Sequence, residues 1–413
     1  MTNPTIDPQW ARPYSRRTFL RGAGGVLGLL ALAPILEACS SDTSAGPFAG
    51  SPTGRVDFAN WPLYLDRSLV KGQVVRPSMQ EFTRQTGIEV NYREVIPDAD
   101  AFYGEILPYL AAGKPTGWDI AVITNGSTLT RMIDLGQVME LPSDRRPNFD
   151  QYASETLAKN PSYDLEPFPN AHTMPWQSGI TGIAWNPDLA GSDVETLEHF
   201  FSGDLPGKIG LFSDSVDMPN LVMLAAGIEP ETSTEADWHK AVQWLQDRID
   251  RGLPVTFFKQ NYVNALANGD VVASMAWSGD IYQENAIGAP EGLQFATPHD
   301  GGLLWTDNMV IPAGALHPVD AITLMDFVYQ PAIAAMITEF VAYVTPVPEA
   351  RNQILADADA APEPAAQEKL RALADSPLVF LPEEEAAALH TYRELKTDQE
   401  RSAWNSAFGR FIT

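Results

Sequence analysis

The chain has little cysteine and few basic side chains. Among its 413 residues Cys39 is the single cysteine, so the fold can hold no internal disulfide and depends on no thiolate chemistry. Lysine and arginine number 27 against 53 aspartates and glutamates, a net charge of −26. Such acidity argues against nucleic acid as a partner and against docking of the folded body on anionic lipid. It is compatible with attraction of small cations, and equally with an acidic surface that only keeps the protein soluble.

The signatures of several enzyme classes are also missing. Residues 203–209 fail a phosphate-binding loop in spacing and in the final Ser/Thr, and neither His-Glu-x-x-His nor Gly-x-Ser-x-Gly occurs. The six histidines are scattered along the chain and are more typical of surface residues than of metal ligands: His172, His199, His239, His299, His317 and His390. We therefore predict no metal, no cofactor and no enzymatic activity.

The apolar run at residues 22–36 is too short and too glycine-rich to span a bilayer comfortably. It follows Ser-Arg-Arg-Thr-Phe-Leu, in which Arg16 and Arg17 are paired, and this order of charged, apolar and small residues is typical of a twin-arginine export signal. A chance Arg-Arg in a disordered terminus is the alternative. We predict a signal over residues 1–38 and a mature protein that acts outside the cytoplasm, in the periplasm or on the outer face of the cell membrane.

Residues 36–39, Leu-Glu-Ala-Cys, resemble a bacterial lipoprotein cleavage box, although Glu37 stands where a small residue is usual. This resemblance implies lipidation of Cys39 and anchoring of the protein to the membrane. The polar, flexible segment 39–54 then serves as a tether. Four arginines and two acids precede Cys39, so 23 basic and 51 acidic side chains remain after it, a net charge of −28.

The chain beyond the tether is long enough for two domains, and its hydrophobic content of 45% indicates a real core. Alternation predicts strands, and helical spacing predicts helices between them. The strands are expected at 55–61, 88–92, 118–123, 180–186, 208–212 and 271–277. The helices are expected around Met79 and Phe82, at 100–112 and 234–251, as one helix or two within 318–344, and over 383–411. The low-complexity patch 356–366 reads as an exposed loop or a short surface helix.

Strands separated by helices imply a mainly parallel α/β sheet. Two such lobes in an exported, tethered chain suggest a protein that closes on a solute around a hinge.

Seven segments resemble segments of one known family, in the same order along the chain: 58–64 (Phe-Ala-Asn-Trp-Pro-Leu-Tyr), 82–90, 117–122, 174–183, 275–280 (Met-Ala-Trp-Ser-Gly-Asp), 301–308 (Gly-Gly-Leu-Leu-Trp-Thr-Asp-Asn) and 343–346. Together they resemble the spermidine/putrescine-binding proteins of ABC importers.

The resemblance implies a two-lobe fold of the periplasmic-binding-protein type (type II), in which each lobe is a mainly parallel sheet flanked by helices. We expect residues 55–174 plus 305–346 to form the first lobe and residues 175–304 plus 347–413 the second. The resemblance also implies a monomer that binds a polyamine between the lobes and delivers it to the transmembrane subunits of an ABC permease.

The matched segments imply these ligand-binding residues: Trp61, Tyr64, Thr124, Trp176, Asp214, Asp217, Trp277, Trp305 and Asp307. Their types suit the task, because each desolvated ammonium group must meet a carboxylate and indole faces attract cations. Trp305 and Asp307 are two apart and share one face of a strand. Asp214 and Asp217 are three apart and share one side of a helical turn. A capping role for the latter pair remains open, since aspartate before a helix is a common cap.

Other functions use the same residue types. A secreted glycoside-active enzyme also needs paired carboxylates and tryptophan platforms. Relatives of the resembled family bind iron, thiamine or sugars, and a lipoprotein scaffold without a small ligand is a further alternative.

Overall fold

The computed structural model describes residues 46–155, 170–259, 261–286 and 292–412. The predicted export signal, Cys39 and the first part of the tether lie outside the described residues.

A single mixed sheet runs through the described part of the chain, in the order β4–β1–β5–β11–β6–β9–β7–β8, with β10 (Gln294–Ala296) beside β6. At one end β1 (Arg55–Asn60) lies between β4 (Glu89–Glu94) and β5 (Ile120–Thr124), all parallel. At the other end β7 (Ile209–Phe212) lies between β8 (Val255–Phe258) and β9 (Ala273–Trp277), again parallel. A hairpin of β2 (Ser68–Val70) and β3 (Gln73–Val75) stands apart. The sheet therefore has two parallel halves, as the alternation predicts.

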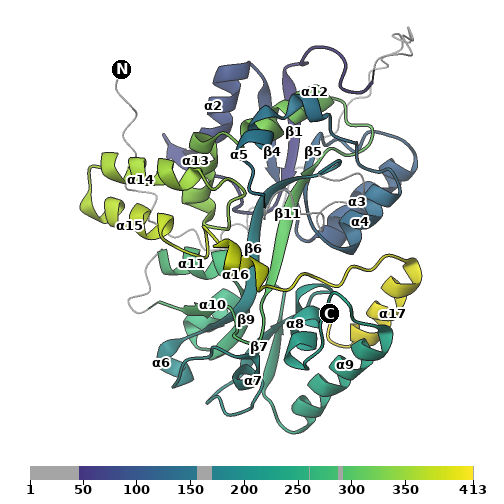
Figure 1. Cartoon of the computed structure of the whole chain (residues 1–413), viewed down its shortest axis with the longest axis vertical. Coiled ribbons are helices and arrows are strands. Elements are labelled where there is room, and N and C mark those ends of the chain that lie inside the picture. The colour runs from purple at the N-terminus through teal and green to yellow at the C-terminus, as the bar shows by residue number, and fades with distance from the viewer. Residues whose placement is uncertain (1–45, 156–169, 260, 287–291, 413) are drawn as a thin grey trace.

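Two long strands join these halves. β6 (Met174–Trp185) and β11 (Leu303–Val310) pair antiparallel and run from one half of the molecule into the other (Figure 1). β11 also pairs antiparallel with β5, and β6 with β9, so both long strands belong to both halves.

Helices cover both halves of the sheet (Figure 1). Around the first half lie α2 (Pro77–Thr86), α3 (Ala99–Ala111), α4 (Ser127–Asp134), α5 (Pro147–Tyr152), α12 (Pro318–Phe327) and α13 (Pro331–Val341), with a 3-10 turn at Ser143–Arg145. Around the second lie α6 (Pro187–Ala190), α7 (Leu197–Phe200), α8 (Asp217–Ala225), α9 (Glu235–Asp250), α10 (Tyr262–Asn268) and α11 (Ser278–Ala286).

Local sequence explains where these helices begin and end. Gly87 adopts a left-handed conformation (φ 75°) that closes α2. Thr234 and Asp237 form a reciprocal capping box that starts α9. The apolar stretch 318–344 is two helices, because Pro331 begins α13 and cannot continue α12. No single helix among the described residues is long and apolar enough to cross a membrane, and α12 and α13 together are bent by 80°.

The C-terminal part departs from the prediction. α14 (Ala350–Ala360) and α15 (Pro364–Ala374) pack with α13, whereas α17 (Asp398–Phe408) packs on α9, so residues 347–413 do not all lie with the second half. The predicted helix over 383–411 is wrong in its middle, because α16 (Glu383–Ala387) ends early and 388–397 are not helical. There the backbone of His390 exchanges hydrogen bonds with Gly302 and Leu304 at the start of β11, which replaces helical bonding.

Candidate functional site

The centre of the candidate site lies on one face of the paired long strands β6 and β11. Asp307 on β11 pairs in register with Thr124 on β5 and with Gln177 on β6. The Thr124 hydroxyl donates a hydrogen bond to Asp307 Oδ1 at 2.5 Å. Trp305, two residues earlier, faces the same way, and its ring lies directly over Gly179: a Cβ added there would come within 2.3 Å of the indole. The bare glycine is therefore what lets the indole lie against the sheet.

Asp217 brings the second half of the molecule to this face. It is the first residue of α8 and is buried. Its Oδ1 accepts hydrogen bonds from the Thr181 hydroxyl and from the Tyr392 hydroxyl (2.6 Å), and its Oδ2 accepts one from the Trp277 indole at 3.3 Å. Thr181 in turn accepts a hydrogen bond from the Trp305 indole at 3.1 Å. A continuous polar chain thus joins the β11 residues to α8.

Asp214 caps a helix with one carboxylate oxygen and leaves the other without a partner among the described residues. Its Oδ1 caps α8 by accepting from the backbone N–H groups of Val216 (2.7 Å) and Asp217 (2.6 Å). Its Oδ2 is enclosed and has no hydrogen-bond partner within the described residues. One oxygen therefore serves the helix, while the other is left for an external donor.

These three carboxylates lie in a low-dielectric setting that disfavours their charge. Burial raises the pKa of Asp307 to about 6 and the pKa of Asp214 to about 7, with the charge of Asp217 adding to both effects. Burial also raises the pKa of Asp217, although three hydrogen bonds oppose the rise. In the described part of the chain no lysine, arginine or histidine forms an ion pair with any of the three. The site gathers three carboxyl groups that no cationic side chain of the described residues neutralises.

Aromatic rings line the same region. The rings of Tyr64 and Tyr343 meet edge to face at 5.5 Å, and Tyr343 lies 5.6 Å from Trp305. Leu63 and Ala342 directly precede the two tyrosines, and both adopt left-handed backbone conformations (φ 60° and 56°) that are uncommon for such residues. At Ala342 this conformation closes the C-terminal end of α13 and so sets the direction in which the chain enters Tyr343.

Sequence reasoning missed one acid, Asp280, in the first turn of α11. The hydroxyls of Tyr343 and Tyr262 donate to its two oxygens, each at 3.0 Å, and its charge acts on the enclosed hydroxyl of Tyr64. Asp280 closes the matched segment 275–280 and follows Trp277 by three residues, so its position was a usable signal. Tyr392 was also missed, because its segment was expected to be helical.

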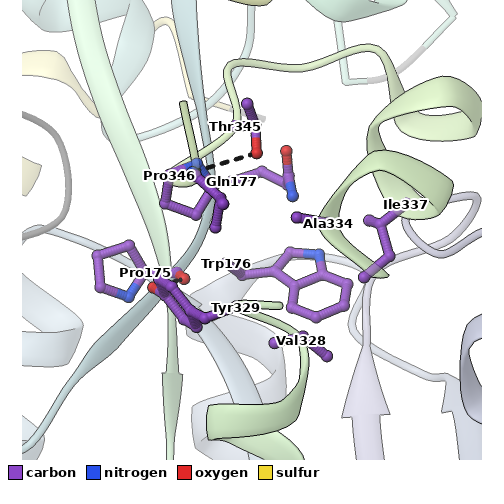
Figure 2. A pocket seen from close by; sticks show the side chains of 10 residues that line it. Pro175, Trp176, Gln177, Val328, Tyr329, Ala334, Ile337, Thr345 and Pro346 are labelled. Atoms are coloured by element: carbon purple, nitrogen blue, oxygen red, sulfur yellow. Dashed lines mark hydrogen bonds between the residues drawn. The ribbon is translucent and has the colours of Figure 1, made fainter. Parts of the chain in front are cut away.

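Two predicted tryptophans take other positions. Trp176 and Gln177 are adjacent on β6, at a bulge in its pairing with β11, and both line one pocket beside α13, where the Trp176 ring lies among Val328, Ala334 and Ile337 (Figure 2). Its indole donates a hydrogen bond to the Tyr64 carbonyl at 3.1 Å, which holds the backbone of Tyr64 in place. Trp61 is half-buried at the end of β1, and its indole donates to the Val122 carbonyl of β5 at 3.1 Å. Contact of Trp61 with a ligand stays a prediction.

The structure also gathers two histidines with acids. His317 meets Asp57 and Asp119, and His390 meets Glu229 and Glu231. The first pair of carboxylates already accepts hydrogen bonds from Arg55, Asn91 and backbone N–H groups. His390 lies 3.0 Å from Glu229 and 3.7 Å from Glu231, distances that an ordinary ion pair explains.

Comparison with known proteins identifies the family of this chain. Residues 78–368 match the family of bacterial extracellular solute-binding proteins. The chain belongs to that family. The fold agrees, since a putative spermidine/putrescine ABC transporter protein from Listeria monocytogenes superposes with a TM-score of 0.69 at 22% identity, over 87% of this chain and 99% of that one. The predicted two-lobe fold of the periplasmic-binding type is thereby confirmed.

Curated relatives in this family include binders of organic cations. A putrescine/agmatine-binding protein of Pseudomonas aeruginosa is 26% identical over 78% of this chain and 84% of its own length. The spermidine/putrescine-binding periplasmic protein of Escherichia coli is 23% identical over 71% of this chain and 78% of its own length. The same fold also holds other solutes, as in a GABA receptor with a TM-score of 0.63 at 13% identity, over 87% of this chain and 98% of that one.

Proposed function

We propose that this solute-binding protein binds a polyamine of the putrescine or spermidine class where the paired strands β6 and β11 pass from one half of the molecule to the other. The observation that carries this proposal is a group of three carboxylates, which no cationic side chain of the described residues neutralises: Asp217 and Asp307 are buried, and Asp214 is half-buried with an enclosed Oδ2. A desolvated carboxylate is costly unless a cation or several donors meet it. A linear polyamine supplies ammonium groups at intervals along an apolar stem, which suits acids separated by aromatic rings.

The rings complete the match. Trp305, Tyr343 and Tyr64 form a contiguous aromatic wall beside Asp307, and Trp277 stands at Asp217. Each aromatic contact with an ammonium group contributes about 0.5–2 kcal/mol. The methylene groups between two ammonium groups can pack on the same rings.

Function outside the cytoplasm follows from the family, and the remaining steps belong to the proposal. The protein acts as a monomer, is carried out by the twin-arginine route, and stays on the membrane through a lipid at Cys39. Closure of the two lobes on the polyamine creates the surface that an ABC permease recognises. We expect no catalytic role, because the described acids of the site are joined to hydroxyl and indole donors.

Isothermal titration of the mature protein with putrescine, spermidine and a glycan panel at pH 8 tests the proposal. We expect saturable micromolar or tighter binding of a polyamine, without turnover. Hydrolysis of a glycan would instead establish the glycoside-active alternative. Failure of every polyamine to bind would refute the proposal.

A further inference from the structure

The Tyr392 hydroxyl donates a hydrogen bond to Asp217, one of the three site carboxylates. Its hydroxyl lies 2.6 Å from Asp217 Oδ1, and the side chain is buried. Burial and the charge of Asp217 raise the pKa of Tyr392 well above 10, so the hydroxyl keeps its proton and acts as a donor. The residue comes from the C-terminal segment, outside the stretch that matches the family.

The backbone on both sides of Tyr392 is fixed. Thr391 N–H donates to Glu231 Oε1 at 2.5 Å, and Arg393 N–H donates to Asn220 Oδ1 at 2.8 Å. Asn220 is buried on α8, one turn beyond Asp217. The contact between Tyr392 and Asp217 is therefore held by the fold and does not depend on a freely moving side chain.

The same segment reaches the other half of the molecule. Glu394 accepts a hydrogen bond from the Thr130 hydroxyl of α4 at 3.0 Å, while the Trp404 indole of α17 donates to the Ser215 carbonyl beside Asp214 at 2.8 Å. The segment after α16 passes between the halves (Figure 1). The contact of Tyr392 with Asp217 therefore forms while the C-terminal segment touches both halves of the molecule.

This contact reduces what Asp217 can offer a ligand. A carboxylate has about four lone-pair positions. Thr181, Tyr392 and Trp277 occupy three of those on Asp217. Asp214 keeps an enclosed oxygen with no donor among the described residues. Asp307 accepts a hydrogen bond from Thr124, and the nearby Tyr64 hydroxyl also favours its charged form. The acids most able to pair with ammonium groups are therefore Asp214 and Asp307.

We propose that Tyr392 is a specificity-determining residue that closes the Asp217 end of the site, so that the site prefers a diamine over a triamine. This inference rests on the proposed polyamine function and refines it. A triamine must bury a third ammonium group, and with Asp217 covered that group lacks a carboxylate partner. Removal of the hydroxyl frees one acceptor position on Asp217 Oδ1, which still accepts from Thr181, for the third ammonium group.

The test compares putrescine and spermidine by isothermal titration at pH 8 on the mature protein and on Tyr392→Phe. The wild type should bind putrescine more tightly than spermidine. In Tyr392→Phe the ratio of the two dissociation constants should shift at least tenfold toward spermidine. Tyr392→Leu, which also removes the ring, should shift the ratio in the same direction.

Tyr329→Phe is the matched control, because the Tyr329 hydroxyl is equally buried and donates to the Pro175 carbonyl rather than to an acid. The control should leave the ratio unchanged. If Tyr392→Phe binds both amines with the wild-type ratio, the specificity role is refuted while the polyamine function stands. If the wild type binds no polyamine, both proposals fall together.

Discussion

Replacing Asp307 with asparagine should have opposite effects on binding and on stability. Asparagine keeps the size of the side chain and can still accept the hydrogen bond from Thr124, but it carries no charge. At pH 8, above its raised pKa of about 6, Asp307 is ionised and available to an ammonium group. The substitution therefore removes the charge from the bound state while leaving the packing largely as it is.

The loss of binding can be estimated from the buried setting. Removing one partner of a buried ion pair costs about 3–5 kcal/mol. At about 1.4 kcal/mol per factor of ten, polyamine affinity should fall at least about 100-fold. Isothermal titration at pH 8 measures this directly, with Asp57→Asn as a matched control at an acid whose partners are Arg55 and Asn91.

The same substitution should increase the stability of the ligand-free protein. Raising the pKa of Asp307 to about 6 implies a burial penalty of roughly 2–3 kcal/mol on its charged form, at about 1.4 kcal/mol per pH unit. Asp307→Asn removes that penalty, so thermal unfolding without ligand should show a higher Tm at pH 8. If the variant binds polyamines as tightly as the parent, Asp307 does not face the ligand; a lower Tm would contradict the view that its charge is uncompensated.

Further predictions concern pH, the aromatic wall and a helix cap. Because burial raises the pKa values of the site acids, the free protein takes up protons on folding between about pH 4 and pH 7, and its Tm should fall as pH rises through that window. Polyamine affinity should instead rise from pH 5.5 to 8, because the acids become charged. Calorimetry that shows the opposite trends would contradict the assignment. Trp305→Ala should weaken binding less than Asp307→Asn, by about 3- to 30-fold, since cation–π contacts contribute about 0.5–2 kcal/mol; an equal loss would overturn this ranking. Gly279→Ala should weaken binding several-fold, because a Cβ at Gly279 would lie 2.4 Å from the Tyr343 ring and displace it from Asp280; unchanged titration curves would show that Tyr343 does not matter to the ligand. Thr234→Ala removes half of a capping box and should lower the free energy of unfolding by about 1 kcal/mol while leaving binding intact, which denaturant unfolding and titration can check.

Local patterns in the sequence predict much of the fold. Alternation marks β1, β4 and β5, glycine and proline mark the ends of α2 and the break before α13, and Thr234 marks the start of α9. These features depend on neighbouring residues, so a single sequence contains them. The region from 388 to 397 depends instead on pairing with β11, far away in the sequence, and its helical prediction fails for that reason.

The sequence predicts Asp214, Asp217 and Asp307 as candidate site acids, but it does not predict Asp280 or the geometry that brings these residues together. Asp307 and Thr124 are brought together by strand register across 183 residues, which no local pattern encodes. Trp176 looks equivalent to the other tryptophans in sequence, yet it stands at a bulge in the pairing of β6 with β11, and its ring fills a pocket beside α13. Tyr392 reaches Asp217 only because the C-terminal segment crosses between the halves.

The central claim, that buried acids become charged to hold an organic cation, is tested most directly by proton release. Titration of putrescine into the mature protein at pH 6.5, in two buffers with different ionisation enthalpies, gives the number of protons exchanged. The raised pKa values of Asp214 and Asp307 predict release of about one proton per polyamine bound. Saturable binding with no proton release, or with uptake, would contradict it.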